Sequence, residues 1–320
     1  MPATAYISAT IGVGMKLNRR ARIDTSQIQD RRGAGGGLGR VPIPIPTGGG
    51  GRGTLIAVAV ALLITLVGGG LGLNALTGES GGPGAGDQAL EQRCAADDAL
   101  SQLDCRNTLY VNSVQAYWRA ALPQHFGEQY RPADTVFFEQ AVNTGCGAAD
   151  SGVGPFYCPA DQQVYIDLSF YRVLAEQLGA PGEFAQPYVV AHEYGHHVQT
   201  LLGISDEVRR QQQRDPGAAN ELSVLMELQA DCFAGAWARN AIGTADETGQ
   251  RIFTSITDQD IQEGLDTAAA IGDDSIAQRS GNPVEPSQFT HGTSAQRQEW
   301  FGRGYQSGDP TVCDTFGGGR

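Results

Sequence analysis

The stretch VVAHEYGHHVQ, residues 189–199, contains three of the five histidines of this 320-residue chain. His192 and His196 stand four positions apart, so on a helix, which rises about 1.5 Å and turns about 100° per residue, both imidazoles lie on one face. Glu193 points to the neighbouring side of the same turn, where it can reach a water on an ion held by the two histidines. The H-E-x-x-H pattern thus supplies two metal ligands and a general base from one helix.

The residues around this pattern predict a buried helix over residues 187–202. Pro187 suits a first helical turn, and Gly203 suits a C-terminal cap. Apolar residues occupy nearly every side of the predicted helix: Tyr188, Val189, Val190, Ala191, Val198, Leu201 and Leu202. Buried histidines and a buried glutamate need polar partners, and a metal would supply them. His197 lies off the ligand face and is predicted to be a packing or surface histidine.

A second long helix is predicted over residues 221–242, ELSVLMELQADCFAGAWARNAI. Glu227 and Asp231 sit four apart among apolar residues, where two like charges would repel each other and lose hydration. A divalent cation would offset this repulsion and loss of hydration. Glu227 would be the third ligand, and Asp231 would accept the N–H of a ligating imidazole. The alternative is that both acids lie on the exposed side of an amphipathic helix.

His291, in FTHGTSAQRQEWF (residues 289–301), is the other candidate third ligand, because catalytic zinc sites use either three histidines or two histidines and a glutamate. We favour Glu227 as the ligand. His291 is then a candidate for stabilising the oxyanion of a tetrahedral intermediate. The alternative is a loop histidine packed in a polar turn. Tyr165 and Tyr194 are further candidates for the oxyanion role.

Residues 55–73 carry no charge and are long enough to span a bilayer. They predict a transmembrane helix over 54–75, preceded by a disordered basic segment, 1–53, and followed by a glycine-rich linker, 76–90. The first segment holds eight Lys/Arg against two Asp, which predicts a single-pass protein with its N-terminus in the cytoplasm. The remaining residues, 91–320, are enough for one sizeable core and are predicted to be an extracytoplasmic domain.

The charge of the chain bears on its partners. Its formal net charge is −13, from 22 Lys/Arg and 35 Asp/Glu. Outside the first 53 residues, 14 basic residues face 33 acidic ones, a balance of −19. This acidic bias argues against nucleic acid as a partner. A peptide or protein substrate and, through the apolar stretch, the membrane remain as the expected partners.

All six cysteines lie after the apolar stretch: Cys94, Cys105, Cys146, Cys158, Cys232 and Cys313. An even number confined to this part of the chain indicates disulfides in an oxidising compartment. Sequence alone does not fix their connectivity, but pairing neighbours along the chain gives Cys94–Cys105, Cys146–Cys158 and Cys232–Cys313. A zinc–thiolate site is disfavoured because the chain has no Cys-x₂-Cys pair.

The remaining elements predict the fold class. Strands are expected at residues 135–142 and 163–168, and further helices at 111–122, 258–270 and 294–307. Because strands precede helices along the chain, the class is α+β. A strand just before the metal-bearing helix could pair with an extended peptide substrate along its edge.

Five separated blocks of the chain follow one order. They are GPFYCPADQQVYIDLSFY (154–171), AHEYGHHVQ (191–199), ELQADCFAGAW (227–237), AIGDD (270–274) and FTHGTSAQR (289–297). Together they resemble the neutral zinc metallopeptidase family of bacterial membrane-anchored proteins. The likeness covers nearly the whole chain, from QDRRG (29–33) to CDTFG (313–317).

The resemblance implies a zincin-like fold with His192 and His196 as zinc ligands and Glu193 as the catalytic residue. The block ELQAD implies Glu227 as the third ligand, as in glutamate-type zincins. The sequence therefore predicts a membrane-anchored, Zn²⁺-dependent endopeptidase. The alternative from another class is a zinc-stabilised binding or scaffolding module of the cell envelope with little or no turnover.

Overall fold

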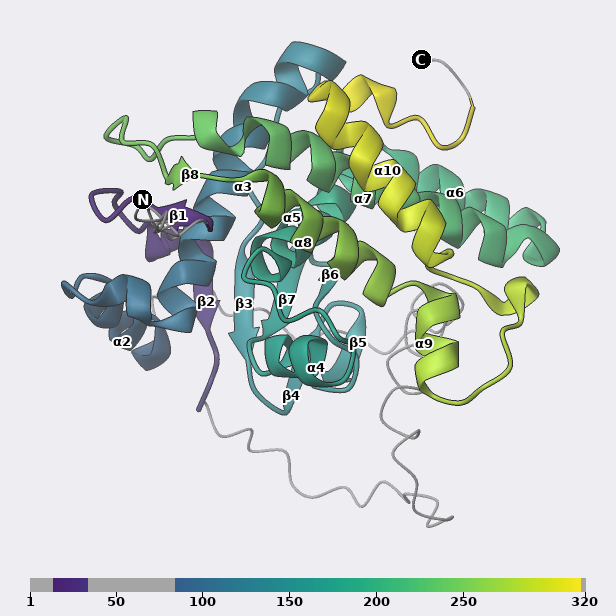
Figure 1. The fold of residues 1–320 in the computed structure, drawn as a ribbon, viewed down its shortest axis with the longest axis horizontal. Helices are drawn as coiled ribbons and strands as arrows, with labels where there is room; N and C mark the ends of the chain where they lie inside the picture. The colour runs from purple at the N-terminus through teal and green to yellow at the C-terminus, as the bar shows by residue number, and fades with distance from the viewer. Residues whose placement is uncertain (1–13, 34–83, 318–320) are drawn as a thin grey trace, which may run out of the picture.

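A computed structural model describes residues 14–33 and 84–317, which contain nine α-helices and eight short strands (Figure 1). The helices are α2 (Ala85–Cys94), α3 (Leu103–Phe126), α4 (Phe170–Glu176), α5 (Ala185–Leu201), α6 (Ile204–Arg214), α7 (Ala219–Asn240), α8 (Asp258–Ala270), α9 (Asp273–Arg279) and α10 (Ser294–Ser307). The strands are β1 (Lys16–Leu17), β2 (Ile28–Asp30), β3 (Thr135–Phe138), β4 (Ala141–Thr144), β5 (Gly147–Asp150), β6 (Phe156–Cys158), β7 (Gln163–Asp167) and β8 (Phe253–Ser255). This is a mixed α+β architecture, as the sequence predicts.

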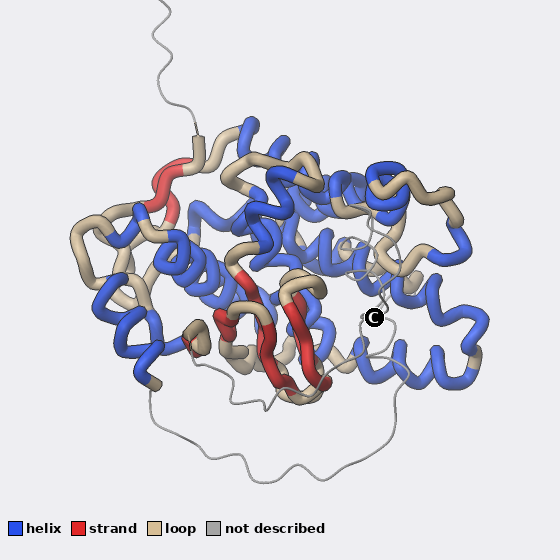
Figure 2. Tube along the Cα trace, turned by 90° about the horizontal axis from the view of Figure 1, so that it is seen from below, coloured by secondary structure: helices blue, strands red, loops and turns tan. Residues whose placement is uncertain are grey.

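The largest sheet has four strands in the order β2-β3-β7-β6. The first three run parallel, and β6 runs antiparallel to β7 at the edge. Alternate residues face opposite sides, so Val164 and Ile166 enter the main core under the helices, whereas Tyr165 enters a smaller cluster with the β4–β5 hairpin. Figure 2 shows that helices make up most of the body around this small sheet.

The strand predicted over residues 135–142 is wrong in its extent. The structure ends β3 at Phe138 and starts β4 at Ala141, in a different sheet. Gln140 separates them with a φ of 66°, in the left-handed region that a continuous strand does not visit. The apolar pattern runs through the break because both strands bury side chains, which is why periodicity alone did not reveal it.

The two helices predicted to carry the ligands pack directly on each other. Gly195 of α5 faces Ala230 of α7, and a Cβ on Gly195 would lie 3.0 Å from the Ala230 Cα. This contact joins the H-E-x-x-H helix to the stretch of α7 between Glu227 and Asp231. On its other side, α7 packs against α10 through two glycines. A Cβ on Gly235 would lie 2.0 Å from a backbone oxygen of α10.

Three disulfides are present, Cys94–Cys105, Cys146–Cys158 and Cys232–Cys313, and they confirm the pairing of neighbours along the chain. The first ties α2 to α3, and the second ties the β4–β5 turn to β6. The third fixes α7 to the C-terminal segment across a sequence separation of 81. Both cysteines are buried, and Cys232 lies on α7, the helix that carries Glu227.

The predicted disorder of residues 1–53 is wrong for residues 14–33. There β1 pairs with β8 and β2 pairs with β3, because Ile28 supplies an apolar side chain to the main core. The predicted domain start at 91 is also too late, since α2 begins at Ala85 within the predicted linker. The predicted transmembrane helix, 54–75, lies outside the described residues. Among those described, no helix is both long and apolar enough to cross a bilayer.

The α7–α10 contact predicts opposite effects for two glycines of α10. Gly304→Ala places a Cβ 1.9 Å from the carbonyl oxygen of Cys232, which forces the helices apart and lowers the free energy of unfolding by about 3 kcal/mol. Gly302→Ala meets nothing closer than 3.8 Å, so higher helix propensity leaves stability unchanged or raises it by up to about 1 kcal/mol. Urea denaturation with the disulfides intact measures both. Equal effects of the two changes would contradict the close packing.

Candidate metal centre

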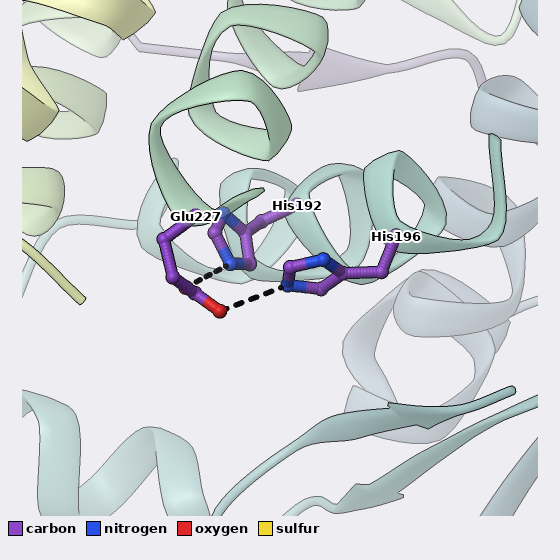
Figure 3. Close-up of side chains that lie close together, drawn as sticks. All are labelled: His192, His196 and Glu227. Carbon is purple, nitrogen blue, oxygen red and sulfur yellow. Dashed lines mark hydrogen bonds and ion pairs between the residues drawn. The ribbon is translucent and has the colours of Figure 1, made fainter. Parts of the chain in front are cut away.

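His192 and His196 of α5 converge on Glu227 of α7, as Figure 3 shows. His192 Nε2 lies 3.1 Å from Glu227 Oε2, and His196 Nε2 lies 3.3 Å from Glu227 Oε1. One ligand atom from each residue falls within 4.8 Å of the others. Ligands that share one tetrahedral zinc at about 2.0 Å stand about 3.3 Å apart, so this donor set fits a zinc ion with little movement.

The other nitrogen of each imidazole is already engaged. His192 Nδ1 lies 2.9 Å from Asp231 Oδ1, and His196 Nδ1 lies 2.9 Å from Gln199 Oε1. The Gln199 amide nitrogen donates to a backbone carbonyl of α7, which orients its oxygen toward the histidine. Carboxylate and amide oxygens only accept hydrogen bonds, so both Nδ1 atoms carry the hydrogen. In the neutral imidazoles the lone pairs on Nε2 therefore face Glu227.

Lone pairs that face a carboxylate require a positive charge between them. Protons on the imidazoles or one divalent cation could supply this charge. The pKa shifts of His192 and Glu227 both favour a positive charge at this position. Burial alone would lower the pKa of His192, but Asp231 and Glu227 raise it to about 10. Burial would raise the pKa of Glu227, yet His196 and His192 hold it well below its usual range. The acid is therefore anionic, as a metal ligand must be.

Asp231 balances its own charge against Arg297, a residue of α10 that the sequence analysis did not single out. Arg297 is 1% exposed, and its Nε and Nη2 lie 2.7 and 3.0 Å from the two carboxylate oxygens. The Tyr188 hydroxyl donates to the same carboxylate at 2.5 Å. Burial opposes the ionisation of Asp231, but Arg297 and His192 lower its pKa. The contact to His192 is the one predicted for Asp231.

Glu193 and His291 both line a cleft of about 630 Å³ that also contains the three candidate ligands. Burial raises the pKa of Glu193, which suits a group that must take up a proton. His291 does not join the candidate ligand group. Its Nδ1 lies 3.1 Å from Asp273 Oδ1, and Asp273 also accepts the backbone N–H groups of residues 290–292. Asp273 thus holds the His291 loop at the cleft, a role that no local pattern indicated.

The structure places the remaining candidates away from the cleft. The Tyr165 hydroxyl donates to Asp161, and the Tyr194 hydroxyl donates to the carbonyl oxygen of Ala133. Neither tyrosine lines the cleft, so the expectation that either could bind an oxyanion is not supported. His197 is fully buried, and burial lowers its pKa to about 4. It is a packing histidine, one of the two roles predicted for it.

The cleft wall is largely apolar. Its apolar lining comes from the loop before β6, from β6 itself, from helices α4, α5, α6, α7 and α9, and from the residues that follow α4 and α8. The residues are Val153, Pro155, Phe156, Tyr157, Phe170, Leu178, Val189, Val208, Met226, Ile271 and Ile276. The three candidate metal ligands and the buried acid Glu193 therefore lie in a concave, largely apolar cleft, as is usual for ligand-binding sites.

Comparison with known proteins agrees with this geometry. The model of the family described as "Putative neutral zinc metallopeptidase" matches residues 17–316. The uncharacterized protein Rv2575 of Mycobacterium tuberculosis is 48% identical over 229 residues, 71% of this chain and 75% of that protein. The uncharacterized protein YpfJ of Escherichia coli K12 is 43% identical over 257 residues, 80% of this chain and 85% of that protein. No solved structure matches.

Removal of one ligand charge tests the site. Glu227→Gln keeps the size of the side chain but loses the anion, so zinc affinity should fall by at least about 100-fold, since even residues behind the ligands contribute 10- to 100-fold. Zinc competition with a chelating dye measures this. Glu221→Gln, on the exposed first turn of the same helix, is the control and should bind zinc like the parent protein. Unchanged affinity in Glu227→Gln would exclude this residue as a ligand.

Proposed function

Because this chain belongs to the neutral zinc metallopeptidase family, we propose that it is a zinc-dependent endopeptidase. The observation that carries the proposal is the convergence of His192, His196 and Glu227 beside Glu193 at an apolar cleft. A structural zinc site has four protein ligands and no opening, whereas a catalytic one has three and faces a cleft. The described residues offer three, and all of them line the cleft.

A zinc ion held by these three residues would supply a Lewis acid for the scissile carbonyl and would activate a water for attack. Glu193 accepts the proton of the attacking water and delivers it to the leaving amine. Asp231 and Gln199 hold the two imidazoles so that Nε2 faces inward. His291, whose Nδ1 faces Asp273 at the cleft wall, can donate a hydrogen bond from Nε2 to the developing oxyanion when both of its ring nitrogens carry a hydrogen.

We further propose that the substrate is an extended peptide with a bulky apolar side chain next to the scissile bond. The apolar lining of the cleft supports that preference. Among the described strands β6 forms one of the two edges of its sheet, and its residues Phe156 and Tyr157 line the cleft. A peptide that pairs with this edge would run past the ligands, with backbone hydrogen bonds for affinity and the apolar wall for specificity.

The proposed location of the metal domain is the extracytoplasmic side of a membrane. Three disulfides with no free cysteine in residues 84–317 support an oxidising compartment. The proposed means of attachment is contact of the uncharged, apolar stretch 55–73 with the membrane, on sequence grounds alone. The net charge of −13 supports a protein substrate over a nucleic acid.

Replacement of the general base tests the mechanism. Glu193→Gln should retain zinc but lose at least about 100-fold in kcat/KM on an unfolded protein such as reduced casein, because the water has lost its proton acceptor. Glu183→Gln, an exposed change ten residues earlier in the chain, should remain fully active. Hydrolysis that survives in Glu193→Gln would contradict the mechanism. A zinc-loaded parent protein that cleaves no substrate would favour the zinc-stabilised binding module instead.

The apolar cleft predicts a substrate preference. In a series of quenched fluorescent peptides that differ at one position beside the scissile bond, Leu and Phe should exceed Asp by about 10- to 100-fold in kcat/KM. Burial of such a side chain contributes about 1.5–3 kcal/mol, and about 1.4 kcal/mol corresponds to a factor of ten. Equal rates across the series, or a preference for Asp, would contradict an apolar specificity site.

A further inference from the structure

Residues 14–33, here called the amino-terminal arm, form part of the same body as the metal centre, although the sequence predicts that a membrane separates them. Within the arm, β2 extends the main sheet by pairing in parallel with β3, with Ile28 opposite Thr135 and Asp30 opposite Phe137. The Arg31 N–H continues the ladder with a bond to the Phe137 carbonyl at 2.9 Å. Ile28 is 4% exposed and belongs to the main core.

Polar side chains of α3 also form hydrogen bonds with the arm. Asn112 forms two bonds with the backbone of Asp24, since its amide donates to the Asp24 carbonyl at 2.9 Å and its oxygen accepts the Asp24 N–H at 3.0 Å. Gln115, also buried, donates to the Gln27 side chain at 2.8 Å. Both α3 residues are buried polar groups that the arm satisfies, so an undocked arm would leave them without these partners.

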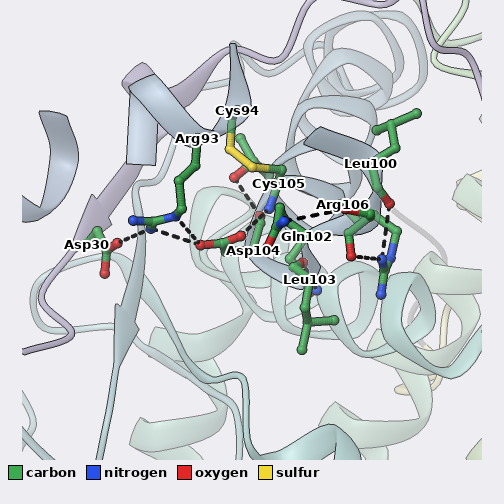
Figure 4. Close-up of a disulfide and its surroundings, with 12 residues drawn as sticks. Asp30, Arg93, Cys94, Leu100, Gln102, Leu103, Asp104, Cys105 and Arg106 are labelled. Atoms are coloured by element: carbon green, nitrogen blue, oxygen red, sulfur yellow. Dashed lines mark hydrogen bonds and ion pairs between the residues drawn. A yellow bond between two sulfur atoms is a disulfide. The ribbon is translucent and has the colours of Figure 1, made fainter. Parts of the chain in front are cut away.

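A cluster of alternating charges lies at the end of β2, and Figure 4 shows three of its members, Asp30, Arg93 and Asp104. Asp30 binds Arg32 at 2.7 Å and Arg93 of α2 at 3.2 Å, and both arginines also bind Asp104 of α3 at 2.7 and 2.9 Å. The Cys94–Cys105 disulfide joins the residues directly beside Arg93 and Asp104. The disulfide therefore links α2 to α3. These two helices supply Arg93 and Asp104, the two members of the cluster that lie outside the arm.

The other end of the arm is attached to a different part of the body. There β1 pairs with β8, and the Met15 N–H donates to Asp260 of α8 at 2.8 Å. Asn18 bonds the backbone of residues 251 and 252 through its side chain and its N–H. The arm therefore crosses from the α8 side of the molecule to the edge of the main sheet, with contacts along its length.

From these contacts we propose that the arm is an integral part of the metal domain and lies on the same side of the membrane. Hydrogen bonds of about 3 Å cannot connect strands across a hydrocarbon layer about 30 Å thick. Residues 33 and 84 both belong to this body, so the chain between them must begin and end on one side. The single pass predicted from the sequence would place residues 33 and 84 on opposite sides, so the packing of the described residues argues against it.

The charge of the arm explains why the sequence pointed the other way. Six of the eight basic residues that precede the apolar stretch lie in the arm: Lys16, Arg19, Arg20, Arg22, Arg31 and Arg32. The rest of the chain is strongly acidic, and Arg32 pairs with Asp104 of that acidic body. Arg32 therefore has a structural role in holding the arm, and a basic residue held in this way is not by itself a topology signal.

The location of both chain ends tests this proposal. Two versions of the full chain carry a biotin-acceptor peptide, one at the amino terminus and one at the carboxyl terminus, in cells with a cytoplasmic biotin ligase. The proposal expects neither tag to be labelled in cells and both to be labelled when ligase is added to spheroplasts. Tags on opposite sides would overturn it. Labelling of both tags in the cytoplasm would keep the shared side and contradict only the extracytoplasmic location proposed above.

Docking itself is measured on the full chain by hydrogen exchange. The amides of residues 28–31 should exchange about a thousandfold or more slowly than in an unfolded peptide. Ile28→Asp should abolish this protection, because it buries a charge, whereas Ser26→Asp, at an exposed position of the same arm, should retain it. Fast exchange of residues 28–31 in the parent protein would overturn the proposal.

Discussion

The close approach of α5 to α7 is the constraint on which the site depends. Gly195 has no side chain to hold the helices apart, and Ala230 lies directly opposite. The contact falls between the two ligating positions of α5 and between Glu227 and Asp231 of α7. A wider separation would leave Glu227 short of His192 and His196, and the three donors would no longer fit one ion. Gly235, the disulfide of Cys232 and the packing of α10 fix α7 from its other side.

Charge alternates from the protein interior to the cleft. Arg297 pairs with Asp231, Asp231 with His192, and His192 with Glu227. Buried charges are stable only when they are paired and hydrogen-bonded, and each pair in this series satisfies the next. The series ends at Glu227, whose negative charge is balanced by protons on the two imidazoles or, in their place, by one divalent cation. Arg297 and Asp231, which are not among the candidate ligands, thus hold His192 in position.

Local patterns predicted the two helices that carry the candidate ligands, Glu227 as the third of these ligands, and the disulfide pairs. Each of these features depends on spacing along one element or on near neighbours in sequence. Contacts between distant elements were missed. Arg297 pairs with Asp231 from 66 residues away, and Asp273 anchors the His291 loop, and neither contact leaves a periodic signal. The ordered structure of residues 14–33 was also missed, because the strand pairing that places them involves residues about 100 positions later.

Anomalous scattering at the zinc edge, from crystals of the protein grown with zinc, tests the central claim most directly. The account predicts one strong peak about 2.0–2.2 Å from His192 Nε2, His196 Nε2 and a carboxylate oxygen of Glu227, with its fourth position open to the cleft. A peak bound by other side chains, or full zinc occupancy with Glu227 turned away, would contradict it.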